Sequence, residues 1–303
     1  YGQSWDVISP DLTTNDPAKQ QSSGGEIVVD NTAAEFHATL LSVAPSPLDS
    51  NVIWTSSDDG LVHVTRDGGK TWKNVTPREM PDFGRVSQID ASAFDSGIAY
   101  VSVRKPLLND FAPYIFKTTD YGATWTKIVA GIPGDEFTRV IREDETRRGL
   151  LYAGTERGVF VSFDDGAQWQ RLQGNLPPVP VHDLVVKEGD LVAGTHGRSF
   201  WVLDDLSALR QTNAAVFAKP AHLFAPRDAY RIEWGGGWGG GGMRGAGASG
   251  TNPGQNPPTG VIVRYHLARA DQAVKLEFLA PDGSVIKAYE SADSATLAAE
   301  RAA

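Results

Sequence analysis

The chain of 303 residues has no cysteine, two methionines and no apolar run of about 18 residues. Without cysteine, disulfide bonds, thiolate metal sites and a cysteine nucleophile are excluded. Without a long apolar run, the sequence predicts no membrane span. Basic residues are fewer than acidic ones, 28 against 37, and the formal net charge is −9. An acidic surface repels phosphate backbones, so we expect no nucleic-acid partner.

The remaining composition is that of a folded protein. Hydrophobic residues make up 41% and charged residues 21% of the chain, which excludes wholesale disorder. The length suits one large domain or two modest ones. The 32 glycines and 8 tryptophans favour many short strands joined by tight turns.

An internal repeat is the strongest signal in the sequence. Three segments follow the pattern Ser/Thr-x-Asp-x-Gly-x-Thr-Trp, with Gln in place of the second Thr in the last: Thr65–Trp72, Thr118–Trp125 and Ser162–Trp169. Residues 1–5 match the second half of the pattern and end on Trp5. The spacing is irregular, but each interval is as long as a blade of a β-propeller.

Each repeat has the same surroundings. Two alternating apolar runs enclose a turn before the motif, and another apolar run lies upstream, as the segments 85–91, 99–101 and 114–116 illustrate. Period-two alternation between turn residues predicts β-hairpins. Four short strands per unit predict propeller blades. A further unit, Leu191–Asp205, lacks the Asp-x-Gly-x-Thr-Trp motif and is interpreted as the last blade.

The motif has a structural interpretation. Its Asp can accept hydrogen bonds from the backbone N–H groups of its own turn, its Gly adopts a positive φ without strain, and its Trp packs against the sheet and anchors the hairpin. We therefore expect no chemistry from these residues. They are Asp67, Gly69, Trp72, Asp120, Gly122, Trp125, Asp164, Gly166 and Trp169.

The number of units predicts an incomplete ring. One partial and four fuller units are too few to close most propellers, and the sequence starts inside a motif. We expect blades to be missing at the N-terminus, and these blades of the same chain would be the partners of the first sheet.

The composition changes after the repeats. Residues 1–232 are predicted to be the C-terminal blades of a propeller, and residues 233–258 a Gly/Pro-rich linker. Residues 259–303 contain alternating runs and a Pro-Asp-Gly turn, which predict the start of a small, truncated β-sandwich. The fold class is therefore all-β.

The repeated motif resembles the Asp-box, or BNR repeat. With Ile53–Trp72, Gly194–Asp205 and Asn256–Gly260, the chain resembles a family of secreted bacterial propellers, variously glycosyl-hydrolase-like or sortilin-propeller-like, followed by an Ig-like module. The resemblance implies an Ig-like fold for the C-terminal part and an extracellular or periplasmic location. It indicates architecture better than function.

Two enzyme families with Asp-boxes can be compared directly. Sialidases carry Arg-Ile-Pro ahead of the boxes, whereas Tyr230–Glu233 here lacks the Pro and follows them. Xyloglucanase-like glycosidases place two aspartates across a cleft between two propellers, and this chain holds at most one. No catalytic residue is carried over from either family.

A ligand site is expected on the face opposite the motif turns, where the turns between second and third strands meet the starts of the inner strands. Convergent His, Arg and carboxylate side chains there could bind a sugar or peptide. Alternatively, they are polar because water fills the channel mouth. The candidates are His37, Asp58, Asp59, Arg85, Arg139, Glu156, His182, His196 and Arg198.

Catalysis and metal binding have weaker support. Glycosidases need two carboxylates flanking one bond, for which Asp58, Asp59 and Glu156 are the nearest candidates, but the sequence does not give their separation. The histidines are too scattered for ligand spacing, and the Asp-Gly turns lack the EF-hand pattern. We expect no metal and no cofactor.

Three functional hypotheses follow. The first is a binding or scaffold propeller that engages a glycan or peptide at its mouth. The alternative is a glycoside hydrolase whose catalytic carboxylates lie partly in missing upstream blades. The third is a purely architectural repeat protein.

Overall fold

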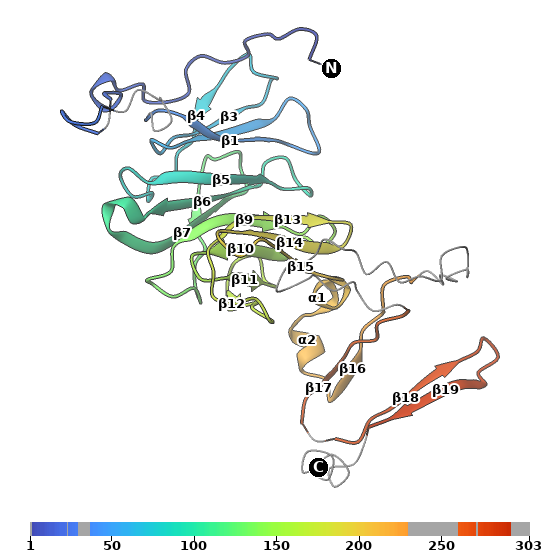
Figure 1. Ribbon diagram of the computed structural model, residues 1–303. Coiled ribbons are helices and arrows are strands. Elements are labelled where there is room, and N and C mark those ends of the chain that lie inside the picture. Colours follow the sequence, from blue (N-terminus) through green and yellow to red (C-terminus); the bar gives the residue numbers. More distant parts are fainter. Residues whose placement is uncertain (1, 23, 30–36, 230–259, 271, 292–303) are drawn as a thin grey trace, which may run out of the picture. The chain divides into compact units, whose positions relative to one another are not determined.

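The computed structural model describes residues 2–22, 24–29, 37–229, 260–270 and 272–291. The chain divides into two compact units, Tyr1–Leu206 and Ser207–Ala303, here called the blade unit and the C-terminal unit. The blade unit contains four antiparallel sheets in which strands pair in chain order. In Figure 1 these sheets follow one another from blue to yellow.

The first three sheets each have four strands and the fourth has three. Sheet 1 consists of β1 (Leu40–Pro45), β2 (Ile53–Ser57), β3 (Val62–Thr65) and β4 (Lys73–Asn74). Sheet 2 consists of β5 (Arg85–Ala91), β6 (Ala99–Lys105), β7 (Asp110–Thr118) and β8 (Thr126–Lys127). Sheet 3 consists of β9 (Thr138–Glu143), β10 (Leu151–Thr155), β11 (Val159–Ser162) and β12 (Gln170–Arg171). Sheet 4 consists of β13 (Val181–Lys187), β14 (Asp190–Thr195) and β15 (Phe200–Leu203). Short 3₁₀ turns lie at Pro17–Lys19 and Pro106–Leu108.

The first strand of each sheet is the inner strand. β1 contacts β5, β5 contacts β9, and β9 contacts β13, so the sheets pack face to face around these strands. Four-stranded antiparallel sheets packed in this order are the blades of a β-propeller. The chain is therefore all-β with propeller blades, and the described residues form no closed ring.

The hydrophobic core lies between successive sheets. Trp54 of sheet 1 packs with Val86 and Phe116 of sheet 2. Between sheets 2 and 3, Ile115 packs with Leu151. Every residue of β10 is buried, because a middle sheet is covered on both faces, whereas β1 alternates between exposed and partly buried positions.

The three motif turns share one hydrogen-bond pattern. In the first, Thr65 Oγ1 donates to Asp67 Oδ1 at 2.8 Å, and Gly69 N donates to Thr65 Oγ1 at 2.9 Å. Asp67 also accepts from the N and Oγ1 of Thr71 at 2.9 and 2.7 Å. These bonds lower the pKa of Asp67 to about 2, with the Thr71 hydroxyl contributing most. Asp120 and Asp164 make the corresponding contacts in the other two turns.

The tryptophans of these turns join neighbouring sheets. Trp125 Nε1 donates to the carbonyl of Val75 at 2.6 Å, and Trp169 Nε1 donates to that of Ile128 at 2.8 Å. Each acceptor directly follows the outer strand of the preceding sheet. The structure adds a second role to the expected one: Trp169 packs with Leu151 and Phe160 of its own sheet, and its indole N–H also binds the sheet before it.

The N-terminal segment takes part in the same pattern. Trp72 Nε1 donates to the carbonyl of Ile8 at 2.8 Å, and a Cβ on Gly69 would lie 2.6 Å from that oxygen. Ile8 follows Trp5 by the same interval that separates Val75 from Trp72. Trp5 itself is 89% exposed, in contrast to Trp169 at 2%, so its partial motif has no comparable packing.

The C-terminal unit contains α1 (Ser207–Gln211), α2 (Ala214–Phe217), β16 (Ala221–Leu223), β17 (Tyr265–Leu267), β18 (Lys275–Leu279) and β19 (Val285–Glu290). Its strands form two antiparallel pairs, β16 with β17 and β18 with β19. The sequence placed a boundary at residue 232, whereas the compact units divide after Leu206. The predicted linker, 233–258, lies outside the described residues, and the Ig-like sandwich remains a prediction.

Candidate functional site

A β-bulge interrupts each inner strand at the same position. The register shifts at Leu41 in β1, Ser87 in β5, Arg139 in β9 and His182 in β13. A bulge redirects the extra side chain out of the regular alternation, and bulges are frequent next to functional sites. In the last two sheets, the redirected side chains are an arginine and a histidine that the sequence had singled out.

A second row of residues lies beside the bulges, where the second strand of each sheet ends. By strand register, the equivalent positions are Asp58, Arg104, Glu156 and His196. Three of them donate a backbone N–H to the residue directly before the inner strand of their own sheet, with N to O distances of 2.9, 3.2 and 2.9 Å for Asp58, Glu156 and His196. The edge that carries Arg85, Arg104, Arg139, Glu156, His182 and His196 is called the rim below.

One ion pair lies at the centre of the rim. Arg139 donates from Nε and one terminal nitrogen to Oε2 of Glu156, at 2.8 and 2.6 Å. Its guanidinium also lies 5.0 Å from the ring centroid of Phe137, which is buried. The only carboxylate among the rim residues is therefore already held by one of the three arginines.

The other two arginines have no such partner. Arg85 and Arg104 are opposite each other in the β5–β6 register. The Nε of each is buried, and within the described ranges neither side chain makes a hydrogen bond or an ion pair. Burial, followed by the positive charges of Arg139 and Arg85, lowers the pKa of Arg104 to about 10. At neutral pH the rim thus carries three guanidinium groups against one carboxylate.

The two histidines complete the rim. The rings of His182 and His196 have centroids 4.9 Å apart and are inclined by 36°. Desolvation lowers the pKa of His182, and the charge of Arg139 lowers it further. Since the ordinary value is 6.5, His182 is mainly neutral at pH 7.

The candidates on sheet 1 lie in a separate group. Asp58 Oδ1 accepts the backbone N–H of Thr39 at 2.7 Å. Asp59 accepts from Ser57 Oγ and from the N and Oγ1 of Thr14, the latter two at 2.6 and 2.7 Å. Burial of Asp59 raises its pKa, but these hydrogen bonds outweigh burial, so the pKa is lowered overall. The nearby His37 also acts to lower it. Both aspartates hold loops in place.

The remaining candidate, Arg198, is exposed in the loop after β14. Its backbone carbonyl accepts a hydrogen bond from Trp201 Nε1 at 2.9 Å. Of the nine candidates named from the sequence, the structure therefore brings five together on the rim: Arg85, Arg139, Glu156, His182 and His196.

Two features of the rim were not predicted. Arg104 is the second-last residue of β6, and the insertion that follows it in the sequence concealed its equivalence to Glu156. The β6–β7 connection and the start of β7 carry an apolar strip, which we define as Leu107, Leu108 and Phe111. These side chains are 89%, 56% and 45% exposed, and the Phe111 ring lies 6.3 Å from that of Phe137. The strip thus continues into the residue on which Arg139 packs.

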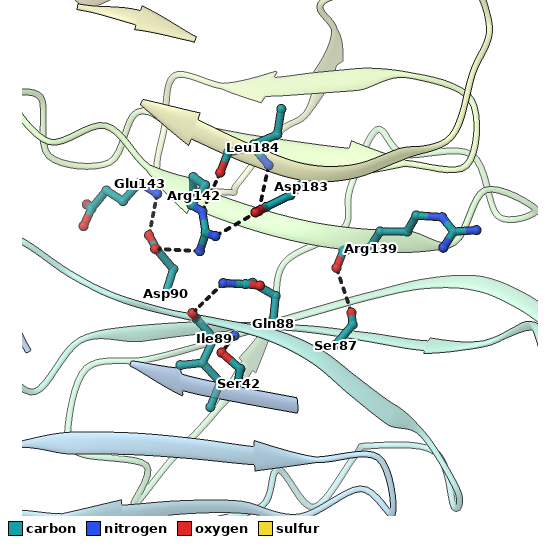
Figure 2. Close-up of polar contacts among 10 residues, drawn as sticks. All are labelled: Ser42, Ser87, Gln88, Ile89, Asp90, Arg139, Arg142, Glu143, Asp183 and Leu184. Carbon is teal, nitrogen blue, oxygen red and sulfur yellow. Dashed lines mark hydrogen bonds and ion pairs between the residues drawn. The ribbon is translucent and has the colours of Figure 1, made fainter. Parts of the chain in front are cut away.

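A different polar cluster lies further along the inner strands (Figure 2). Arg142 donates to Asp90 Oδ1 at 3.2 Å, to Asp183 Oδ1 at 2.9 Å and to the carbonyl of Leu184 at 2.7 Å. Asp90 also accepts the backbone N–H of Glu143 at 2.8 Å. This inner-strand network joins β5, β9 and β13, so it holds three sheets together.

The inner-strand network and the rim are oriented differently. In Figure 2 the side chain of Arg139 extends away from the network, and only its carbonyl faces β5, where it accepts a hydrogen bond from Ser87 Oγ at 2.7 Å. Burial raises the pKa of Asp90 to about 6, although the Arg142 charge opposes the shift. The network is a structural element, whereas the rim presents cations that the described contacts do not neutralise.

The described residues include no helix with the length and apolar character needed to cross a bilayer. No family model and no curated protein matches the sequence. Three solved structures illustrate what the fold is similar to. "YCF48 bound to D1 peptide" is 21% identical, with 55% of this chain and 51% of that chain covered and a TM-score of 0.43. A GH74 enzyme of Niastella koreensis is 16% identical, with 55% and 28% covered and a TM-score of 0.41.

The third is the β-propeller domain of Cps50 (Swd1) from Myceliophteria thermophila. It is 12% identical, with 54% of this chain and 51% of that chain covered and a TM-score of 0.42. The alignments with these three structures span about half of two of them and less of the other.

Proposed function

We propose that the blade unit is a binding module that holds a peptide along the rim and the apolar strip. The observation that carries this proposal is the row of in-register bulges, which brings arginine, histidine and glutamate side chains from sheets 2 and 3 together with those of sheet 4. The sheets are already joined by the inner-strand network and the tryptophan clasps. Other residues therefore make the contacts that join the sheets, and the rim cations remain for binding a ligand.

The composition of the surface favours a peptide over a glycan. Two of the three side chains of the apolar strip, Leu107 and Leu108, are aliphatic and the most exposed, and they have no ring face on which a sugar could stack. They follow Arg104 and Lys105 after a single proline, so a cationic segment and an apolar segment are adjacent in the chain. A peptide with an apolar residue next to an acidic group matches both properties.

A hydrolytic role has less support from the same residues. A glycosidase needs a carboxylic acid with a raised pKa and a second, available carboxylate. Glu156 is held by Arg139, and hydrogen bonds lower the pKa of Asp59 despite its burial. No observation in the described residues favours the glycoside hydrolase alternative.

The finer sequence expectations belong to the same proposal. We regard the motif turns as Asp-boxes of a secreted propeller because their Ser/Thr, Asp and Gly residues share one hydrogen-bond pattern. An extracellular or periplasmic location follows from that resemblance.

Selection from a displayed peptide library would test the proposal. We expect the protein to enrich peptides, and the double variant L107S/F111S to lose them, because serine removes the apolar contact of two exposed side chains. The variant K70A is the control, since Lys70 is exposed in a motif turn away from the rim. Failure to enrich any peptide, enrichment that L107S/F111S retains, or binding to a glycan array instead would contradict a peptide-binding rim.

A further inference from the structure

The unpartnered arginines of the rim need an explanation. A buried N–H group without an acceptor costs free energy, and like charges placed side by side add to that cost. The Nε atoms of Arg85 and Arg104 are both buried without an acceptor, and the charge of Arg85 lowers the pKa of Arg104. At a water-exposed site, water would accept hydrogen bonds from the N–H groups and screen the repulsion between the two charges.

The chain had many carboxylates with which to neutralise this site. It contains 37 acidic residues against 28 basic ones. In the inner-strand network, two of them flank a single arginine, Arg142. On the rim, three arginines share Glu156 alone, and Arg139 occupies its Oε2. The missing negative charge is therefore local to the pair Arg85 and Arg104.

We propose that Arg85 and Arg104 form a subsite for a carboxylate group of the bound peptide. The inference rests on the proposed function, since it names the chemistry that the rim recognises. Guanidinium groups donate charge-assisted, often bidentate hydrogen bonds to carboxylates, which would satisfy the two buried Nε–H groups. The third guanidinium, that of Arg139, lies within electrostatic reach of Arg104 and adds to the attraction.

The surroundings favour a carboxylate that belongs to a peptide. Glu156 lies close enough to influence both Arg104 and His182, so it reduces the net positive charge that a bound anion meets. The apolar strip beside Arg104 adds room for an aliphatic side chain next to the carboxylate.

Two sources provide the same chemistry in a peptide: the chain-terminal carboxylate and an acidic side chain. Three small probes separate them. Acetyl-Leu-Leu with a free carboxylate presents the terminal group, acetyl-Leu-Leu amide presents none, and acetyl-Leu-Glu amide presents only the side chain. Inorganic phosphate is the fourth probe and tests whether the subsite prefers a carboxylate carried by a peptide to a free anion.

Titration calorimetry with these probes tests the subsite. We expect at least one carboxylate probe to bind about tenfold or more tightly than the amide, because a charged hydrogen bond carries about one factor of ten. The stronger of the two carboxylate probes identifies the source. Equal affinity for the amide and both carboxylates, tighter binding of phosphate, or no binding of any probe would overturn the proposal.

Variants locate the effect. R85Q and R104Q should each weaken carboxylate binding by about tenfold, and R104K, which keeps the charge but loses the planar fork, should fall between R104Q and the parent protein. K70Q removes a cation elsewhere and should leave the affinity unchanged. Thermal unfolding of each variant verifies folding. Unchanged affinity in R85Q and R104Q would contradict the assignment.

The failure of this proposal can be distinguished from failure of the proposed function. If the displayed library yields peptides that L107S/F111S loses but R104Q retains, the rim binds peptides without a carboxylate subsite. If the library yields no peptides, the proposed function itself fails.

Discussion

Strand β9 carries two arginines, Arg139 and Arg142, that belong to different environments. Arg142 donates to two carboxylates and a backbone carbonyl, and it joins three sheets. Arg139 lies on a bulge and extends to the rim, where it holds Glu156 beside Arg85 and Arg104, which have no partner in the described part of the chain. The comparison separates an arginine whose charge is paired within the fold from arginines whose charges are not paired within the described residues.

The physical difference lies in how each site balances its charges. In the inner-strand network, Arg142 faces Asp90 and Asp183, and desolvation of Asp90 is offset by a paired guanidinium and a backbone N–H. On the rim, cations lie next to cations. Removing Arg142 should therefore lower the free energy of unfolding, whereas removing Arg104 should leave it unchanged or raise it.

The largest effect is expected for R142Q. Removing one partner of a partly buried ion pair leaves Asp90 desolvated without its counter-charge, which costs about 3 kcal/mol in the free energy of unfolding. Urea unfolding measures this value. R157Q is the control, because Arg157 pairs with Asp135 at an exposed site and should cost less than about 0.5 kcal/mol. Equal losses in R142Q and R157Q would remove the distinction between network and surface pair.

A double-mutant cycle sharpens the assignment of that loss to one pair. D90N, R142Q and the double variant should give a coupling free energy of about 1–3 kcal/mol, since Asp90 and Arg142 are in direct contact. A coupling close to zero would mean that the R142Q loss comes from the contacts with Asp183 and Leu184 instead.

R104Q should leave the free energy of unfolding unchanged or raise it by up to about 1 kcal/mol. The substitution removes a desolvated charge that is repelled by Arg85 and Arg139, and it breaks no side-chain hydrogen bond within the described residues. The same urea experiment provides the measurement. A loss comparable to that of R142Q would assign Arg104 to the fold and not to a ligand.

The smallest effect is a pH dependence from His182. Its folded pKa lies below the ordinary 6.5, so the folded protein binds fewer protons there, and its contribution to stability decreases as the pH falls below that value. Asp90 has the opposite sign, because its folded pKa of about 6 lies above the ordinary 3.8; its contribution is lost as the pH rises through 6.

The difference between the parent protein and H182Q isolates the histidine. Protonated His182 adds a cation beside Arg139, Arg104 and His196, with Glu156 as the opposing carboxylate. Carboxylate probes should therefore bind more tightly at pH 5.5 than at pH 7 in the parent protein, by about two- to fivefold, and H182Q should lose this increase. The same increase in H182Q would assign it to another group.

The fold was predictable where its determinants are local. Asp67 and Thr71 are four residues apart, so the hydrogen bonds of the motif turn follow from one short segment. The alternating runs likewise predicted four-stranded blades. The acceptor of Trp125 is not local, since Val75 belongs to the preceding sheet, and the contact between the two sheets was therefore not predicted.

The site was predictable only in part. The turn and strand positions located Arg139, Glu156 and His182 on one edge, but the bulges that redirect two of them depend on the pairing of strands and leave no signal in the sequence. Arg104 was missed because the insertion after it hides its register. The contact between Asp90 and Arg142 spans two sheets, and no local pattern encodes it.

The most direct test compares both kinds of arginine in one spectrum. In a ¹⁵N titration that observes the Nε–H groups of arginine, saturation with the tightest-binding carboxylate probe should shift the Arg85 and Arg104 signals, because these groups gain an acceptor. The Arg142 signal should stay in place, since its Nε–H already donates to Leu184. Shifts at Arg142 with none at Arg85 and Arg104 would contradict the central claim that the rim cations are kept for a ligand.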